Sequence, residues 1–161
     1  MESWGDIWRT VFGRLTGRLA NFWWLEEGRV AGGSRPTSLR ELRWVEGMGI
    51  KTLIGLSLTR VPEEWVGRLG LEYHHFPIKN HEAPSPGLVR RVASIIDASL
   101  GEGRPVLVHC SAGRGRTGCV LAAWLMLSRG LEAPEAIGRV RLREPGAIER
   151  RQEEFLRGLQ P

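Results

Sequence analysis

Apolar residues recur along this chain at two spacings, one typical of helices and one typical of strands. Residues 4–15 carry apolar side chains three and four positions apart, which predicts a helix with one apolar face (Trp4, Ile7, Trp8, Val11, Phe12 and Leu15). Short apolar runs bounded by Gly, Pro or charged residues predict strands, and longer mixed segments predict helices. Strands are expected at 22–25, 29–31, 50–56, 71–76 and 106–109, and further helices at 38–47, after 62, and at 86–100, 117–129, 133–143 and 149–159.

The order of these segments predicts the fold. Glu26-Glu27-Gly28 separates the first two predicted strands and favours a hairpin. Ser38 is placed to cap the next helix, and Glu41 follows three residues later as the second half of a capping box. Strands that alternate with helices predict an α/β fold: a single domain with a central, mostly parallel, twisted sheet flanked by helices. We expect an N-terminal amphipathic helix over 1–20 and the domain itself over 21–161.

A glycine-rich loop lies between the end of one predicted strand and the start of a predicted helix. It spans the ten residues 109–118 and follows the apolar run 105–108. Free backbone N–H groups and the helix dipole make such a loop a binding site for an anion. Gly113, Gly115 and Gly118 let the backbone curl and approach a ligand closely. The loop is therefore the predicted phosphate-binding site, formed by Ser111, Ala112, Gly113, Arg114, Gly115 and Arg116.

A cysteine and an arginine stand at the two ends of this loop, and together they suit phosphoryl transfer. The N–H groups that hold an anion also stabilise the thiolate of Cys110, which is its nucleophilic form. Arg116, six residues later, can hold two phosphate oxygens with its planar guanidinium. A thiolate beneath a bound phosphoryl group attacks phosphorus and forms a cysteinyl-phosphate, which water then hydrolyses. Thr117 is placed to donate to the departing sulfur in that second step.

The run Val-His-Cys-Ser-Ala-Gly-x-Gly-Arg-Thr-Gly at 108–118 resembles the signature of the cysteine-dependent protein tyrosine phosphatase superfamily. The segments 28–32 and 141–148 resemble its small dual-specificity-like members, and the similarity covers residues 21–157. The resemblance implies a phosphatase catalytic domain over 21–161. Its expected substrates are phosphorylated proteins, with phosphotyrosine first and phosphoserine or phosphothreonine as further ones. A structural cysteine buried in a glycine-rich turn is the alternative, which the ten matched positions disfavour.

The resemblance also implies a general acid on the loop between residues 76 and 86, where this sequence departs from the family. Relatives carry an Asp there, but alignment of the loop places Ile78 or Asn80 at that position. The chain has two Asp residues, and neither lies in this loop (Asp6 and Asp97). Three interpretations stay open: Glu82 is the acid from a shifted position, His81 is the acid, or no side chain protonates the leaving group.

A site without an acid would favour leaving groups that are already stable anions, which defines the alternative functions. RNA 5′-triphosphatases of the superfamily lack the Asp and have similar loops around His81, and phosphoinositide phosphatases carry a basic residue where Arg114 stands. A catalytically weak phosphate-binding module is the second alternative. By resemblance, Gln152 positions the hydrolytic water or is a plain helix-surface residue, and His109 braces the loop through hydrogen bonds.

Length, charge and cysteine content bear on the number of domains, the class of partner and the cellular compartment. A chain of 161 residues suits one domain, and its net charge of +5 suits anionic substrates, while no motif makes nucleic acid the leading partner. Besides Cys110 the only cysteine is Cys119, on an apolar helix, which favours a core role and a reducing compartment. We therefore expect a cytoplasmic enzyme without a cofactor or metal. No apolar run is long enough for stable membrane insertion, and a monomer or weak dimer is expected.

The apolar face of the N-terminal helix allows two arrangements. Arg9, Arg14 and Arg18 lie off this face, and a Trp-rich helix flanked by arginines is able to lie on a membrane surface. Apolar helix faces more often pack against protein. We therefore expect the helix to pack on the domain or on a second subunit.

Overall fold

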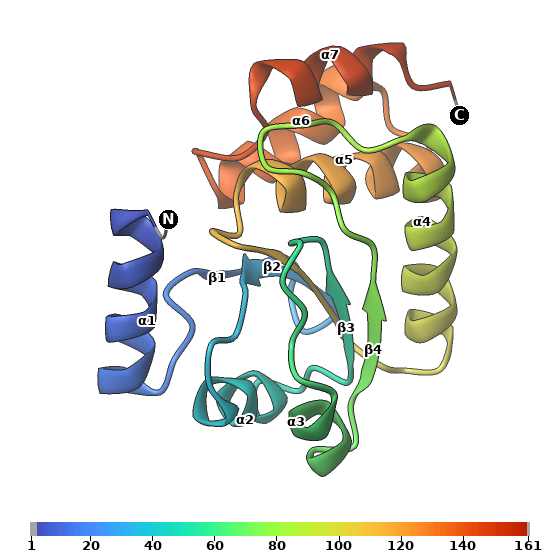
Figure 1. The fold of residues 1–161 in the computed structure, drawn as a ribbon. Coiled ribbons are helices and arrows are strands. Elements are labelled where there is room, and N and C mark those ends of the chain that lie inside the picture. Colours follow the sequence, from blue (N-terminus) through green and yellow to red (C-terminus); the bar gives the residue numbers. More distant parts are fainter. Residues whose placement is uncertain (1–2, 161) are drawn as a thin grey trace.

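A computed structural model describes residues 3–160, which form one five-stranded sheet with helices on both of its faces (Figure 1). In chain order the elements are α1 (Trp4–Thr16), β1 (Phe22–Glu26), β2 (Val30–Ser34), α2 (Leu39–Gly47), β3 (Thr52–Gly55), α3 (Glu63–Arg68), β4 (Glu72–His75), α4 (Pro86–Gly101), β5 (Val106–Cys110), α5 (Gly115–Arg129), α6 (Ala133–Arg143) and α7 (Arg150–Gly158). Each segment predicted from the sequence is present, and the ends differ from prediction by only a few residues.

Strand β5 occupies the centre of the sheet, whose strand order is β1-β2-β5-β3-β4. It pairs in parallel with β2 on one side and β3 on the other, so Val106 lies beside both Val30 and Thr52. β1 and β2 form the predicted antiparallel hairpin, and Gly28 in its turn has a φ of 67°, which favours glycine. The predicted α/β fold with a mostly parallel sheet is confirmed.

The two faces of the sheet bury different sets of helices, because successive side chains of a strand point in opposite directions. Val106 and Val108 pack in one cluster with residues of α4, α5, α6 and α7, whereas Leu107 packs in another with residues of α2 and α3. Helix α5 is buried over most of its length, and even its large Trp124 side chain is 0% exposed. Its position between the sheet and α6 explains why its sequence is apolar on every side.

The start of α2 corrects one prediction. The Ser38 hydroxyl does accept the backbone N–H of Glu41, at 3.2 Å. The Glu41 carboxylate, however, accepts the backbone N–H and the hydroxyl of Thr37, each at 2.8 Å, and does not return to Ser38. Only half of the predicted capping box forms, because Thr37 offers two donors one residue before the cap.

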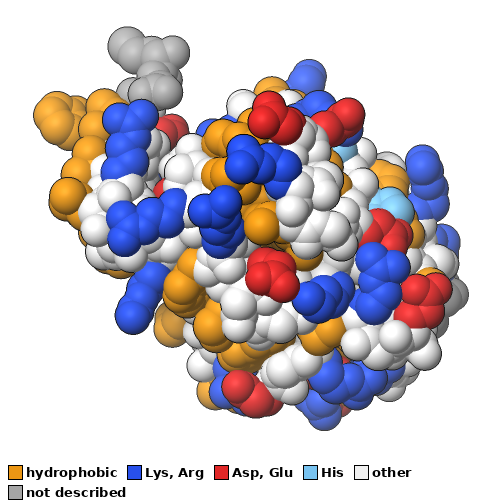
Figure 2. Space-filling model, turned by 90° about the horizontal axis from the view of Figure 1, so that it is seen from below, with side chains coloured by type: hydrophobic (Ala, Val, Ile, Leu, Met, Phe, Trp, Pro, Cys, Tyr) orange, Lys and Arg blue, Asp and Glu red, His pale blue; other side chains and the backbone are white. Residues whose placement is uncertain are grey.

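Helix α1 corrects a second prediction, because its apolar face points away from the domain. Trp4 is 88% exposed and Leu15 76%, and Ile7, Trp8 and Val11 are exposed as well. Figure 2 shows hydrophobic side chains along the outer edge of this helix. The helix meets the domain through small residues instead: a Cβ on Gly13 would lie 1.7 Å from the Glu41 carboxylate, and Gly17 lies against the Arg40 side chain. Packing of the apolar face on the domain is therefore wrong, and its packing on a second subunit stays a prediction.

The helices in the described part of the chain are also too short or too polar to cross a bilayer.

Candidate active site

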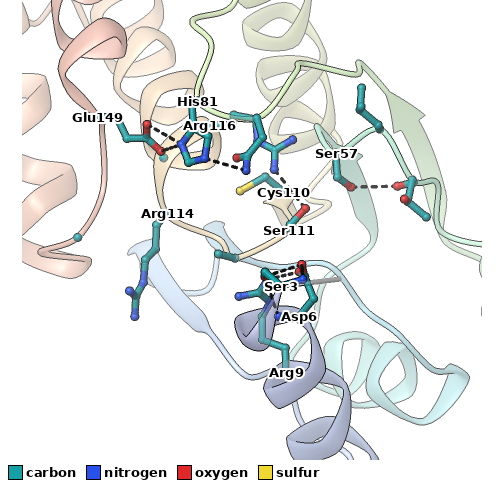
Figure 3. A pocket seen from close by; sticks show the side chains of 16 residues that line it. Ser3, Asp6, Arg9, Ser57, His81, Cys110, Ser111, Arg114, Arg116 and Glu149 are labelled. Carbon is teal, nitrogen blue, oxygen red and sulfur yellow. Dashed lines mark hydrogen bonds and ion pairs between the residues drawn. The ribbon is translucent and has the colours of Figure 1, made fainter. Parts of the chain in front are cut away.

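Cys110 ends the central strand, and the loop that follows it leads directly into α5. The cysteine is 2% exposed, and the backbone N–H of Gly113 donates to its sulfur at 3.3 Å. α5 begins at Gly115, two residues earlier than predicted, so its free N–H groups belong to the loop itself. The sulfur lies at the floor of a cleft of about 510 Å³ (Figure 3).

The β1–β2 hairpin holds this loop in place. The indole N–H of Trp23 donates to the Gly113 carbonyl at 3.0 Å, and the Asn21 amide donates to the Ala112 carbonyl at 3.1 Å. Gly113 has a φ of 78°, and a Cβ on it would lie 2.3 Å from the Gly33 carbonyl carbon. Sequence reasoning missed Asn21 and Trp23. The consecutive glycines in β2 are a signal of close backbone approach that points to this contact.

Arg116 is buried without a carboxylate partner among residues 3–160. Its side chain donates to the Ile78 carbonyl at 2.9 Å and to the Ser111 hydroxyl at 3.1 Å. The residue is 5% exposed and lines the same cleft as Cys110. A buried guanidinium held only by neutral acceptors is prepared for an anion. The structure thus brings together the two residues that the sequence paired for phosphoryl transfer.

Thr117 and His109 flank this pair and are both fully buried. Neither the Thr117 hydroxyl nor either ring nitrogen of His109 has a hydrogen-bond partner among the described residues. The His109 ring stacks on Tyr73, with ring centroids 6.4 Å apart. Burial, helped by the charge of Arg35, lowers the pKa of His109 to about 3, so the ring is neutral. The hydrogen-bond bracing expected of His109 is therefore absent, and packing holds the ring.

Two further loops close the upper side of the cleft, and they bring a histidine and a glutamate together. His81 lines the cleft, and its Nδ1 lies 2.9 Å from the Glu149 carboxylate (Figure 3). The backbone of His81 has a φ of 65°, which is uncommon outside glycine. The Asn80 amide, also in the cleft, lies 3.1 Å from the other ring nitrogen. Glu149, which starts the last helix, was not among the residues singled out from the sequence.

Glu82 does not line this cleft. Its side chain is exposed, and only its carbonyl oxygen has a partner in the site: it accepts the Gln152 amide at 3.2 Å. Gln152 is 0% exposed, so the helix-surface interpretation of this glutamine is wrong. Its side-chain oxygen accepts the Glu149 backbone N–H at 2.8 Å. Gln152 therefore ties the loop of His81 to the start of α7.

The remaining predicted residues have clear positions. Ser111, Ala112 and Gly115 line the cleft with Cys110. Arg114 also borders it, but its guanidinium points away from the sulfur and lies 3.6 Å from Glu144 (Figure 3). Cys119 is fully buried, and burial raises the pKa of its thiol, which agrees with a core role.

Helix α1 contributes an unexpected wall to the cleft through Ser3, Asp6 and Arg9. Hydrogen bonds from Ser3 lower the pKa of the Asp6 carboxyl, and Arg9 pairs with it. Asp6 is therefore an ionised acceptor and a poor proton donor. Since α1 precedes the predicted domain and shares no motif with it, the sequence carried no signal that this helix reaches the site.

Comparisons with known proteins agree with this geometry. The family model described as Swiss Army Knife protein, DSP-PTPase phosphatase domain, matches residues 19–160. The chain is 31% identical over 140 residues to the mouse protein tyrosine phosphatase domain-containing protein 1, which covers 73% of this chain and 18% of that protein. It is 27% identical over 115 residues to the human dual specificity protein phosphatase CDC14C, covering 71% and 25% respectively. The chain thus spans a quarter or less of these curated relatives.

Solved structures give the same result. The crystal structure of Tk-PTP in the active form superposes with a TM-score of 0.76 at 35% identity, covering 85% of this chain and 93% of that one. A mutant form of Tk-PTP superposes with a TM-score of 0.79 at 36% identity and the same coverage. Residues 19–160, which the family model matches, contain the whole sheet and the Cys110–Arg116 loop. The chain therefore belongs to the dual-specificity phosphatase family of the cysteine-dependent protein tyrosine phosphatase superfamily.

Proposed function

We propose that this protein is a cytoplasmic phosphatase that hydrolyses phosphotyrosine, and also phosphoserine or phosphothreonine, in proteins. The observation that carries the proposal is the pair at the floor of the cleft. The Cys110 sulfur accepts a loop N–H, and the Arg116 guanidinium is buried with neutral partners only. Such a pair suits a phosphoryl dianion, which would be the anionic partner that Arg116 lacks.

The reaction would take place in two steps. The Cys110 thiolate attacks phosphorus, an S–P bond forms, the P–O bond to the substrate breaks, and the leaving oxygen takes a proton. Water then attacks the cysteinyl-phosphate and gives a proton back to the group that protonated the leaving oxygen, an O–P bond forms, the S–P bond breaks, and inorganic phosphate leaves. The Thr117 hydroxyl, which has no partner among the described residues, would donate to the sulfur as it departs.

The proton donor for the first step is proposed to be His81, oriented by Glu149. Both line the cleft with Cys110, whereas Glu82 does not. The Glu149 carboxylate, 2.9 Å from Nδ1, holds the ring in one orientation. Leu58, 63% exposed on the wall of the cleft, offers apolar surface for an aromatic ring and supports phosphotyrosine as the first substrate.

The test compares turnover and binding in two cysteine variants. Cys110→Ser should abolish hydrolysis of a phosphotyrosine peptide and of p-nitrophenyl phosphate, yet still bind the peptide, because the loop amides and Arg116 remain. Cys119→Ala, the matched control, should keep turnover. Measurable hydrolysis by Cys110→Ser would contradict the mechanism.

The substrate is tested with the wild-type enzyme on phosphotyrosine peptide, phosphoserine peptide and 5′-triphosphorylated RNA at matched enzyme concentration. A preference for phosphotyrosine peptide is expected. Preference for the RNA would replace the protein substrate with an anhydride, whose leaving group needs no proton.

A further inference from the structure

Helix α1 presents an exposed apolar face that residues 3–160 leave uncovered. Five side chains form this surface, which we call the α1 face: Trp4, Ile7, Trp8, Val11 and Leu15. Their exposed fractions run from 43% at Ile7 to 88% at Trp4. They recur at helical spacing and lie within one stripe about 100° wide. A contiguous exposed apolar surface of this kind marks an interaction site.

The packing of α1 on the domain keeps this face pointing outward. Gly13 and Gly17 lie on the opposite side of the helix, where an added Cβ would run into side chains of α2. Ser3 and Asp6 close the start of the helix with a capping box. The α1 face is therefore presented by a helix that is already formed and held in place, so binding does not have to order it first.

Four arginines lie at the C-terminal end of α1, and we call them the border arginines: Arg14, Arg18, Arg40 and Arg43. Arg14 lies in the last turn of α1, and Arg18 follows its C-cap. Arg40 and Arg43 are three residues apart on α2, and the Arg40 guanidinium donates to the Arg14 carbonyl at 3.5 Å. All four are exposed, and none forms an ion pair within residues 3–160. Figure 2 shows basic side chains beside the hydrophobic edge of this helix.

The charge beside the α1 face distinguishes an anionic lipid surface from a second copy of this chain. The one acidic residue among residues 3–18 is Asp6, which lines the catalytic cleft and pairs with Arg9. The matching face of a second copy therefore offers the border arginines no carboxylate. Anionic lipid headgroups offer each of them a negative partner, and Trp side chains are favoured at the boundary between headgroups and acyl chains.

We propose that α1 lies on an anionic membrane surface, with the α1 face among the headgroups and the border arginines on the lipid phosphates. The helix adsorbs and does not span, since its 13 residues are fewer than the about 20 that cross a bilayer. Ser3, Asp6 and Arg9 of the same helix line the catalytic cleft, so adsorption keeps the cleft about one helix diameter, roughly 10–12 Å, from the lipid. The inference concerns binding and does not depend on which phosphoester the enzyme hydrolyses.

The experiment measures co-sedimentation of the full chain with vesicles of phosphatidylglycerol and phosphatidylcholine in equal parts, and with vesicles of phosphatidylcholine alone. We expect binding to the anionic vesicles that weakens as sodium chloride is added, and much weaker binding to the neutral ones. Replacing both tryptophans, Trp4→Ala with Trp8→Ala, should weaken binding about tenfold or more, because large apolar side chains are lost from the lipid contact. Leu142→Ala, an exposed apolar residue on α6, is the control and should keep the wild-type affinity.

A second pair of variants separates the border arginines from the net charge of the protein. Arg14→Gln with Arg18→Gln should weaken binding to the anionic vesicles about tenfold or more, since each basic residue near such a surface contributes several-fold. Arg143→Gln with Arg151→Gln removes the same charge from exposed positions on α6 and α7 and should weaken binding much less. Every replaced side chain is exposed, so these variants are expected to fold.

Several results would overturn the proposal. Among them are no binding of the wild type to anionic vesicles, equal binding to both kinds of vesicle, and wild-type affinity in either the double Trp variant or the Arg14 and Arg18 variant. Sedimentation velocity without lipid tests the other occupant. A monomer supports the lipid assignment, whereas a dimer that the double Trp variant dissociates would assign the α1 face to a second copy of the chain.

Discussion

At the scale of single residues, the proton donor is the part of the site that the sequence alone did not assign to one residue. The sequence offered Glu82 and His81 as acids, and the structure places only His81 in the cleft, with Glu149 beside it. The side-chain direction of a loop residue depends on backbone angles that the sequence does not reveal. Here His81, whose backbone has a φ of 65°, lines the cleft, and its neighbour Glu82 does not.

Substitution of the acid candidates should separate them. His81→Gln is expected to slow hydrolysis of phosphotyrosine peptide about 100-fold or more, the low end of general-acid contributions, and to slow p-nitrophenyl phosphate much less. The alkaline limb of its rate–pH profile should flatten, because the ionisation that ends activity has been removed. Steady-state rates across pH provide the measurement.

Glu82→Gln serves as the matched control and should keep the wild-type profile. Glu149→Gln should fall between the two, since it leaves His81 in place but without its orienting carboxylate. A wild-type profile in His81→Gln, with a flattened one in Glu82→Gln, would reverse the assignment.

The buried His109 predicts a loss of stability in mild acid. Its pKa is about 3 in the folded protein, below the ordinary value of about 6.5, so the unfolded chain binds a proton that the native one does not. The stability that comes from this histidine is complete above pH ~6.5 and is lost as the pH falls toward ~3, by up to about 1.4 kcal/mol per pH unit.

Urea unfolding of wild type and His109→Gln between neutral and mildly acidic pH tests this. The variant should lose less stability across that window than the wild type does, whereas His81→Gln, an exposed histidine, should follow the wild type. Parallel curves for wild type and His109→Gln would show that His109 is not the group responsible.

At the scale of elements, periodicity predicted nearly every helix and strand but not what each one faces. The spacing of Trp4, Trp8 and Leu15 correctly marks an apolar face of α1, yet that face is exposed, because Gly13 and Gly17 bring the opposite side against α2. The local sequence of α1 does not reveal that its glycine side, and not its apolar face, meets the domain. The contributions of Asn21, Trp23 and α1 to the site were not predicted either, because these residues are far from the catalytic loop in the sequence.

The exposure of α1 gives a direct prediction about stability. Trp4→Ala should change the free energy of unfolding by no more than about 0.5 kcal/mol, as exposed substitutions do. Trp124→Ala, the same change at a fully buried position, should cost about 3–5 kcal/mol. Chemical denaturation of both variants provides the comparison, and a large loss in Trp4→Ala would mean that its ring packs against protein in solution.

At the scale of the whole molecule, net charge predicts how salt affects catalysis. The chain carries a net charge of +5, and its substrates are expected to be anionic. Long-range attraction between them is screened over about 8 Å at physiological ionic strength. kcat/KM for a phosphotyrosine peptide with acidic flanks should therefore fall as sodium chloride is added.

A peptide of the same length with basic flanks is the control, and its kcat/KM should fall less or rise. Identical salt dependence for the two peptides would show that the charge of the whole molecule does not guide their encounter with the cleft.

The central position of β5 has a consequence for how the protein is made. The strands on either side of it, β2 and β3, belong to the first half of the chain and do not pair with each other in this sheet. Their facing edges therefore stay unpaired until residues 106–110 have been synthesised. During synthesis on a ribosome, the nascent first half would expose apolar surface until the strand that ends in Cys110 emerges. The catalytic loop would take shape in the same event that completes the sheet. Recovery of enzymatic activity during refolding would thus report the closing of the sheet itself.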